Sequence, residues 1–327
     1  MMKAARMSDL KSIWSKVDGS RIVGQIAREH MVASTSLTVA ACGVSRKGLE
    51  IVRDVMSLKL YRRISKKMQA DLPSLKVQIE NEYQQGEVKR NNTIWTLWLQ
   101  GEGKAPYIVR ECISSMRDNL PEKQLVVLDQ DSFDEYCKLP QHVLEKYKNG
   151  VISRTHLSDL LRLELLCTKG GTWIDSTVWL SGKPPAFMTD SQLFLFQNLK
   201  PGLDGKSISM SSWWITAQAP SKVLLLTRAL LYRWWEKYNR MDDYFLIHYL
   251  MQLAIDCYPD EWGRVVPASN GTPHCLLLRL GDTFDKGVYE GLCEQSSVHK
   301  LTYKNVEQFS GQDTYLNHIF PGFGAKS

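Results

Sequence analysis

Two acidic residues and an arginine lie close together in one short stretch of the sequence. Asp159 and Arg162 are three residues apart in a run with helical periodicity, so their side chains share one face and can pair. Gly170 and Gly171 end this helix, because glycine adopts the left-handed conformation of a C-cap without strain. Asp175 follows a short apolar run that predicts a buried strand. A carboxylate at the carboxyl end of such a strand lies where open α/β sheets bind ligands.

Each of these residues also has a purely structural interpretation. Asp159 and Arg162 could form an ion pair on a helix surface, which contributes only ~0.3–0.5 kcal/mol, and Asp175 could cap a turn. For a single aspartate we would prefer that interpretation. The two aspartates, the arginine and the glycine pair occur together in one stretch, and this combination favours a ligand-binding site.

The elements that must position these residues alternate between strands and helices. β-Branched, aromatic and wholly apolar runs predict buried strands, at 93–99, 124–128 and 172–180. Apolar residues at helical spacing predict helices, at 105–119, 139–148 and 158–168. This order predicts an α/β domain with a mostly parallel sheet.

Composition excludes several classes of protein. Among 327 residues, 43% are hydrophobic and 23% are charged, which excludes a fibrous or wholly disordered chain. No run approaches the ~18–20 apolar residues of a membrane span, and the first residues lack the pattern of a secretion signal. The seven cysteines form no Cys-x-x-Cys pair, which argues against a zinc ribbon or a thioredoxin-like site. Scattered free cysteines are typical of the reducing cytoplasm, where we expect this protein.

The amino-terminal part of the chain differs in texture from the rest. Residues 1–80 are predicted to be helical and residues 81–92 to form a polar linker. The chain is therefore divided into an amino-terminal helical region, 1–90, and a main domain, 91–327. The stretch 46–67 carries a net charge of +6, which equals the formal net charge of the whole chain. We find no motif that would make this charge a nucleic-acid-binding site.

The basic stretch also has an apolar stripe. Val52, Met56, Leu60 and Ile64 recur every four residues, which predicts an amphipathic helix. One interpretation is a surface helix whose stripe packs on the rest of the protein. The alternative is a helix that lies on an anionic membrane surface or binds an acidic partner.

These motifs resemble those of the bacterial capsular-polysaccharide-synthesis glycosyltransferases. They are also similar to glycosyltransferase family 32 and to the sugar-transferring domains of large clostridial toxins. The resemblance covers about residues 93–327, and its most specific part is Asp-x-x-Arg followed by Gly-Gly-x-x-x-Asp. The matching segments are 94–101, 158–162, 170–175, 243–248 and 299–303. The resemblance implies a Rossmann-like glycosyltransferase A-type fold that binds a nucleotide sugar, with UDP-sugars favoured.

The resemblance also implies roles for individual residues. The catalytic residues would be Asp159, Arg162 and Asp175, of which the first two contact the ribose, the diphosphate or the donor sugar. One of two tryptophans would stack on uracil, although each could equally be a core residue. The donor-binding residues implied in this way are Trp95, Trp98, Gly170, Gly171, Thr177, His299 and Lys300.

The sequence departs from the family pattern at Thr177. Asp175 matches the first carboxylate of the family's Asp-x-Asp motif, but Thr177 occupies the position of the second. Mg²⁺ and Mn²⁺ prefer oxygen ligands, charged ones above all, so a threonine hydroxyl is a poor substitute. Either Asp175 and the donor phosphates bind the metal with help from elsewhere, or His299 and Lys300 replace it. His299 could also be a surface-loop histidine.

A second patch lies further along the chain. Asp243 and His248 are expected near the acceptor or the leaving phosphate, although Asp242 or Asp243 could instead be the N-cap of a helix. The hydroxyls and aromatic rings of residues 211–216 would suit a sugar platform.

The sequence therefore predicts a hexosyltransferase for capsular or surface polysaccharide synthesis. It would move a sugar from a nucleotide-sugar donor to a glycan or lipid-linked glycan, and the resemblance suggests retention at the anomeric carbon. We expect it in the cytoplasm or on the inner face of the membrane. One alternative is a glycoside hydrolase, which needs two carboxylates, whereas Asp175 has none beside it in its motif. The other is a non-enzymatic scaffold at the membrane with a degenerate site.

Overall fold

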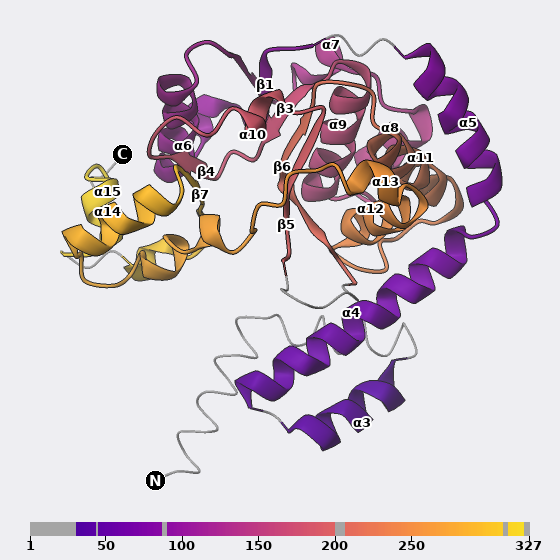
Figure 1. Ribbon diagram of the computed structural model, residues 1–327, viewed down its shortest axis with the longest axis horizontal. Coiled ribbons are helices and arrows are strands. Elements are labelled where there is room, and N and C mark those ends of the chain that lie inside the picture. The colour runs from indigo at the N-terminus through magenta and orange to yellow at the C-terminus, as the bar shows by residue number, and fades with distance from the viewer. Residues whose placement is uncertain (1–30, 44, 87–89, 200–206, 310–312, 324–327) are drawn as a thin grey trace.

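The computed structural model describes residues 31–43, 45–86, 90–199, 207–309 and 313–323. A five-stranded sheet in the order β2-β1-β3-β6-β5 forms its centre (Figure 1). Its strands are β1 (Thr93–Leu97), β2 (Gln124–Leu128), β3 (Gly171–Ile174), β5 (Leu193–Gln197) and β6 (Met210–Ala217). β1 pairs in parallel with β2 and β3, whereas β6 runs antiparallel to β3 and β5. Four strands thus run in one direction, and the fold is mixed α/β with a mostly parallel sheet.

Helices cover both faces of this sheet (Figure 1). The described α-helices are α3 (Val32–Cys42), α4 (Arg46–Met68), α5 (Leu72–Gln85), α6 (Tyr107–Asn119), α7 (Phe133–Tyr136), α8 (Gln141–Lys148), α9 (Arg154–Thr168), α10 (Phe187–Asp190), α11 (Lys222–Lys237), α12 (Leu246–Cys257), α13 (Pro259–Trp262), α14 (Lys286–Gln295) and α15 (Tyr315–Ile319). Among the described helices, none combines the length and the hydrophobicity that a transmembrane span requires.

Alternate residues of the strands enter different hydrophobic clusters. Trp95 and Trp173 pack with α9, α11 and α12 on one side, whereas their neighbours Ile94 and Ile174 pack with residues of α6 and β5 on the other. This follows from the two-residue period of a strand, which sends successive side chains to opposite faces. Both faces are buried, which explains the continuous apolar runs of the strands.

The predicted third strand is divided in two, which corrects the prediction of one strand over 172–180. β3 ends at Ile174, and β4 (Val178–Leu180) leaves the main sheet to pair with β7 (Val298–Lys300) in a separate two-stranded ribbon. The backbone N of Val178 donates to the carbonyl of Asp175 at 3.0 Å. The chain therefore turns at Asp175, which stands at the junction of the two sheets.

The predicted linker is shorter than expected, because α5 extends to Gln85. The apolar stripe of the basic segment packs against the body of the protein. Leu60, Ile64 and Met68 of α4 are buried in the same core cluster as α11 and α12, and Leu75 of α5 joins them. The structure thus confirms the packing interpretation for this stripe.

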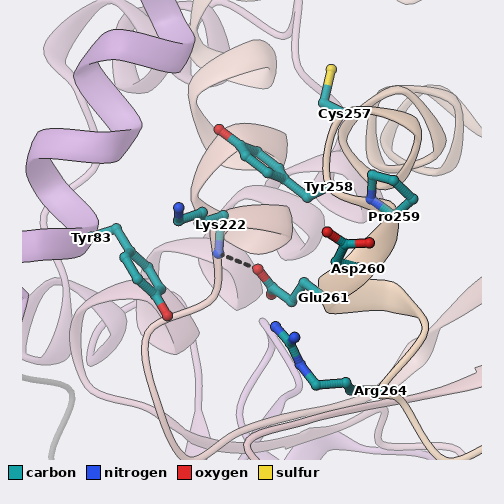
Figure 2. A pocket seen from close by; sticks show the side chains of 8 residues that line it. All are labelled: Tyr83, Lys222, Cys257, Tyr258, Pro259, Asp260, Glu261 and Arg264. Atoms are coloured by element: carbon teal, nitrogen blue, oxygen red, sulfur yellow. Dashed lines mark hydrogen bonds between the residues drawn. The ribbon is translucent and has the colours of Figure 1, made fainter.

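A pocket of about 300 Å³ lies between α5, α11 and α13 (Figure 2). Lys222 Nζ in this pocket pairs with Glu80 at 2.7 Å, and the backbone N of Lys222 donates to Glu261 at 3.0 Å. Lys222 and Glu261 are thus paired within the protein. Lys222 begins α11, and Trp235, which contacts α9, lies near the other end of that helix.

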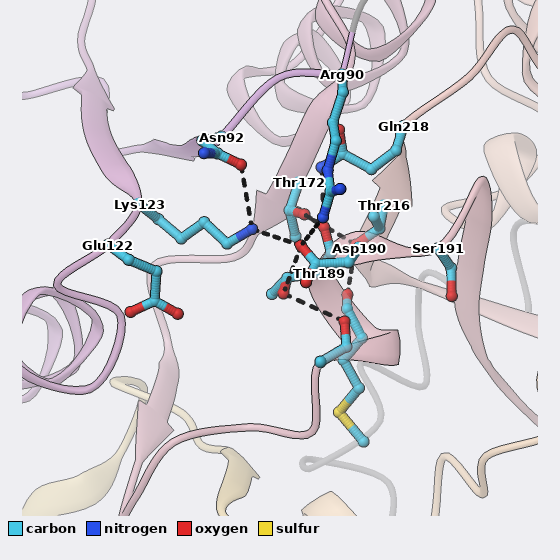
Figure 3. A network of polar contacts seen from close by, with 12 residues as sticks. Arg90, Asn92, Glu122, Lys123, Thr172, Thr189, Asp190, Ser191, Thr216 and Gln218 are labelled. Atoms are coloured by element: carbon cyan, nitrogen blue, oxygen red, sulfur yellow. Dashed lines mark hydrogen bonds and ion pairs between the residues drawn. The ribbon is translucent and has the colours of Figure 1, made fainter.

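A network of polar contacts closes the edge at which β1, β2 and β3 begin (Figure 3). Asp190 pairs with Lys123 at 2.6 Å and with Arg90 at 3.6 Å. Thr172 and Thr216 form a hydrogen bond at 2.9 Å across β3 and β6. These groups satisfy one another, so this edge is structural, and the opposite edge carries Asp175.

Candidate active site

The three residues that the sequence grouped contact one another. Arg162 Nη2 lies 3.0 Å from Asp175 Oδ1, and Arg162 Nη1 lies 3.3 Å from Asp159 Oδ1. Nη1 also donates to the backbone carbonyl of Ser212 in β6 at 2.7 Å. Arg162 is 4% exposed. Its guanidinium group is therefore a buried bridge between the two carboxylates rather than a surface cation.

Two elements give these side chains their positions. α9 begins at Ser153, whose hydroxyl accepts from the backbone N of His156 at 3.2 Å, and it is buried along most of its length. Asp175 follows β3, and its backbone N donates to the carbonyl of Trp213 in β6 at 2.8 Å. Its Oδ1 also accepts from Trp173 Nε1 at 2.9 Å. The carboxylate is thus fixed at the carboxyl end of β3.

A lysine from the far end of the chain completes the group. Lys300 of β7 lies with its Nζ 3.6 Å from Asp175 Oδ2 and donates a hydrogen bond to Thr177 Oγ1. Its predicted companion His299 does not reach Asp175. The His299 ring is buried, lies 2.9 Å from Ser181 Oγ through Nε2, and packs beside Trp179. Consecutive residues of a strand face opposite sides, so only one of the two can meet the site.

The charges of the site shift two pKa values. Burial alone would raise the pKa of Asp159, but the charge of Arg162 and the hydrogen bond from His156 outweigh it and hold that pKa below its usual value. Asp159 is therefore ionised at neutral pH. Burial and the charge of Arg162 lower the pKa of His248 to about 4, against the opposing effect of Asp159 and Asp175. His248 is therefore neutral at pH 7.

Comparison with known proteins gives a family for this arrangement. The sequence pattern of the family described as "Capsular polysaccharide synthesis protein" matches residues 47–319. The chain belongs to that family. No curated protein matches the sequence.

Two solved structures resemble the chain at low sequence identity. "PaToxG Glycosyltransferase" is 12% identical, with a TM-score of 0.38 over 60% of this chain and 80% of that one. A structure described as a transferase mutant is 10% identical, with a TM-score of 0.29 over 65% of this chain and 90% of that one. At such TM-scores the likeness carries no information about the site.

The residues of this family member do not suit a divalent cation. Both oxygens of Asp175 already face cations, Arg162 on one and Lys300 on the other, and the Thr177 hydroxyl accepts from Lys300. Within the described residues, no three His, Cys, Asp or Glu side chains gather in a way that could hold a metal ion. The ammonium group of Lys300 supplies a positive charge beside Asp175, where a metal would otherwise be expected.

The two candidate tryptophans have different environments. Trp95 is 4% exposed, lies edge-on to Tyr136 and donates from Nε1 to the carbonyl of Gly170 at 2.8 Å. It is a core residue, which corrects the donor-binding role implied for it. Trp98 follows β1 at the edge that carries Asp175, is half-buried and lies edge-on to Tyr303 at 5.1 Å. Its buried Nε1 has no partner among the described residues.

The glycine pair is structural, which also differs from the implied donor-binding role. Gly170 and Gly171 lie before Asp175 by the length of β3, at the opposite end of that strand. Gly171 has a φ of 95°, and a Cβ there would lie 2.6 Å from the backbone oxygen of Thr93. Glycine is thus required for the close approach of β3 to β1.

Of the predicted acceptor-side residues Asp243 and His248, only His248 lies near Asp175. Asp243 accepts from the backbone N of Phe245 at 2.7 Å and shapes the turn before α12. Neither Asp242 nor Asp243 is the N-cap, which is Phe245. Asp242 pairs with Lys67 and anchors α4. His248 lies within the electrostatic influence of Asp175, and its Nδ1 is buried without a partner among the described residues.

The prediction that residues 211–216 form a sugar platform was wrong, because these residues lie within the fully buried strand β6. The carbonyls of Ser212 and Trp213 accept hydrogen bonds from Arg162 and from the backbone N of Asp175.

Two histidines near the site had not been predicted from the sequence. His156 lies 3.2 Å from Asp159 Oδ2 through Nδ1, and its spacing of three residues on one helix could have revealed it. His274 lies edge-on to Trp213 and close enough to Lys300 for that charge, together with the larger effect of burial, to lower its pKa. No spacing in the sequence indicates His274.

Proposed function

We propose that this member of the capsular polysaccharide synthesis family is a glycosyltransferase that uses a nucleotide-sugar donor. The observation that carries the proposal is the fixed carboxylate of Asp175 between Arg162 and Lys300, at the ligand-binding edge of a mostly parallel sheet. Membership of the family supports the same function. A UDP-sugar donor, a glycosyltransferase A-type fold and a glycan or lipid-linked acceptor are part of this proposal.

The chemistry that the site must perform is the departure of a diphosphate. Negative charge grows on the leaving group while the sugar gains oxocarbenium character, so a cation fixed beforehand lowers the barrier. Lys300 supplies that cation, since its side chain is 17% exposed whereas that of Arg162 is 5% exposed. Asp175 binds the donor sugar, and Arg162 orients Asp175. Mg²⁺ or Mn²⁺ is not part of this proposal, because Lys300 already neutralises the carboxylate.

The donor base and the acceptor have separate candidates. Trp98 offers an aromatic face and a buried N–H group at the same edge of the sheet, which suits a uracil ring. His248 is neutral and half-buried, and its Nδ1 has no partner among the described residues, which suits a hydrogen bond to the acceptor or to the leaving phosphate. We propose these two roles for Trp98 and His248, and retention at the anomeric carbon remains part of the proposal.

The hydrolase alternative is less consistent with the charges of the site. A glycosidase needs one carboxyl group with a raised pKa to protonate the leaving oxygen. The carboxyl group that shares the Arg162 bridge with Asp175 is Asp159, and its pKa is lowered. Asp159 is therefore a poor general acid.

The experiment is a binding and turnover assay with Asp175→Asn. UDP, GDP and their sugars are screened for an increase in the melting temperature, since a ligand of the folded state stabilises it by mass action. We expect one nucleotide sugar to stabilise and to be consumed, and the variant to keep its fold but lose about 10²-fold or more in turnover. Consumption of polymer without a nucleotide would support a hydrolase. Full biological activity of the variant would support the scaffold.

Peripheral membrane binding is a separate part of the proposal. The stripe predicted for it is buried, but α4 has an outward face where Ile51 and Leu58 are exposed at 50% and 36%. Lys59, Arg62 and Lys66 are exposed near them. In Figure 1 the first turns of α4, together with α3, extend beyond the sheet domain. Exposed apolar residues beside cations suit an anionic lipid surface.

Co-sedimentation with vesicles tests this surface. We expect binding to vesicles in which about one third of the lipid is anionic, and loss of binding at high salt. Replacing Lys59, Arg62 and Lys66 by glutamine should abolish it. A matched control replaces three exposed cations elsewhere, Lys138, Lys148 and Arg154. Equal loss in the two triple variants would contradict a specific surface.

A further inference from the structure

The Asp159 carboxylate has a second partner beyond Arg162. His156 lies one turn earlier on α9, with Nδ1 3.2 Å from Asp159 Oδ2. Its other ring nitrogen, Nε2, accepts a hydrogen bond from Trp235 Nε1 of α11 at 2.9 Å. His156 and Trp235 are buried, at 1% and 0% exposed. A continuous line of polar contacts therefore joins α11 to the carboxyl end of β3.

The direction of each hydrogen bond in this line follows from the chemistry of the groups. An indole N–H can only donate, so Nε2 of His156 must be the unprotonated acceptor. The remaining proton of the neutral ring is then on Nδ1, where it is donated to the ionised Asp159. Trp235 thus selects one of the two tautomers of His156. In the other tautomer, two N–H groups would face each other and the carboxylate would lose a donor.

The tautomer of His156 affects the position of Asp175 through Asp159 and Arg162. One oxygen of Asp159 accepts from His156 and the other faces Arg162, so the carboxylate plane is fixed by both. Arg162 in turn holds Asp175 at 3.0 Å. A group that orients a ligating residue from behind commonly affects turnover by about 10–100-fold.

We propose that His156 and Trp235 are positioning residues, in which Trp235 locks the Nδ1–H tautomer of His156 so that Asp159 and Arg162 hold Asp175 in the orientation needed by the donor sugar. The proposal rests on the glycosyltransferase function proposed above. Neither residue touches the donor, so each acts on the donor sugar only through the position of Asp175.

The experiment compares two neighbouring tryptophans of α11. Trp235→Phe removes the indole donor to His156, and Trp234→Phe is the matched control, since Trp234 is equally buried and donates to the carbonyl of Arg240 at 3.0 Å. Each variant loses one buried hydrogen bond, so similar losses in melting temperature are expected. We expect kcat to fall about ten-fold in Trp235→Phe alone, with an unchanged affinity for the free nucleoside diphosphate, which Lys300 faces in the proposed function.

Two further measurements separate positioning from folding. The ¹⁵N chemical shifts of His156 should report a protonated Nδ1 and an unprotonated Nε2, and a mixture of tautomers in Trp235→Phe. His156→Asn keeps an N–H group near the position of Nδ1, so it should retain turnover within about three-fold. His156→Leu, which has no donor, should lose about 100-fold.

Several results would overturn this inference. They are a protonated Nε2 in the unmodified protein, equal losses of kcat in Trp234→Phe and Trp235→Phe, and equal losses in His156→Asn and His156→Leu. Absence of any nucleotide-sugar turnover in the unmodified protein would instead refute the proposed function, and with it the positioning role. The tautomer of His156 would still be decided by the ¹⁵N shifts, so the two failures can be told apart.

Discussion

The ammonium group of Lys300 lies 3.6 Å from Oδ2 of Asp175, while Arg162 occupies the other carboxylate oxygen. The two cations differ in their access to solvent, because the Arg162 side chain is 5% exposed and that of Lys300 is 17% exposed. Arg162 is therefore a buried residue that holds Asp175 in place, whereas Lys300 is the more accessible of the two cations. The first two predictions follow from this difference.

Lys300→Met should lower turnover by about 10²-fold, because it removes the cation that we propose stabilises the departing diphosphate. Affinity for the free nucleoside diphosphate should also fall. The control is Lys286→Met in α14, whose side chain is 79% exposed, and it should leave both quantities unchanged. Steady-state kinetics and calorimetric titration measure the two effects. A Lys300→Met protein with unchanged kcat would exclude the role proposed for this lysine.

Chelation should leave turnover unchanged, because Lys300 already neutralises the carboxylate that would bind a metal. The assay is repeated after exhaustive dialysis against EDTA, and then with added Mg²⁺ or Mn²⁺. We expect the same kcat in all three conditions. Recovery of activity by Mn²⁺ after its loss in EDTA would show that Asp175 binds metal together with the donor phosphates.

Gly171→Ala should destabilise the protein by about 2–5 kcal/mol, the sum of left-handed backbone strain and a clash. Its φ is 95°, and the added Cβ would lie 2.6 Å from the oxygen of Thr93. Gly150→Ala is the control, with a φ of 71° and no atom within 4 Å of the added Cβ. It should lose only about 1–2 kcal/mol. Urea unfolding measures the loss of stability in both variants. Equal losses would mean that the close packing of Gly171 against β1 does not add to the cost of the substitution.

Trp98→Ala and Trp95→Phe should fail in different ways. Removing the half-buried ring of Trp98 should raise the KM for the donor about ten-fold or more, since stacking of a base on an aromatic ring contributes about 1–3 kcal/mol. Trp95→Phe should instead lower the melting temperature, because the bond to Gly170 is lost. Kinetics and calorimetry on both variants distinguish the two outcomes. An unchanged KM in Trp98→Ala would remove this residue from the base pocket.

Stability should decrease as the pH falls from 6.5 to 4. Burial lowers the pKa of His299 to about 4, from an ordinary value of 6.5. Between these values the unfolded chain binds a proton that the folded protein does not, so acid favours unfolding. The contribution of His299 is about 3 kcal/mol across this range. Denaturant unfolding at several pH values should give a shallower pH dependence in His299→Gln, and parallel curves would contradict the assignment.

The bounds of an element were predictable where the hydrophobic pattern alone determines them. β2 has the predicted bounds Gln124–Leu128, and α6 ends at Asn119 as expected. The sequence placed Asp175 after an apolar run, but it did not show that Val178–Leu180, which is apolar again, belongs to a different sheet. Only pairing with distant strands, β6 on one side and β7 on the other, determines where the chain turns. The reversed direction of β6 likewise has no signal in its own residues.

The site was predictable where its residues share one element. Asp159 and Arg162 could be grouped because helical spacing places them on one face. The choice between His299 and Lys300 could not be made, because strand residues alternate and the sequence does not say which face meets Asp175. Trp235 lies 79 residues from His156 along the chain, so no local pattern connects them.

The positive charge beside Asp175 comes from a ribbon that is not part of the central sheet. β7 pairs with β4 over only three residues, and it belongs to the last part of the chain. In a chimera between relatives, exchanging the segment that contains β7 would therefore change the charge next to Asp175 without altering β3, the strand that Asp175 follows.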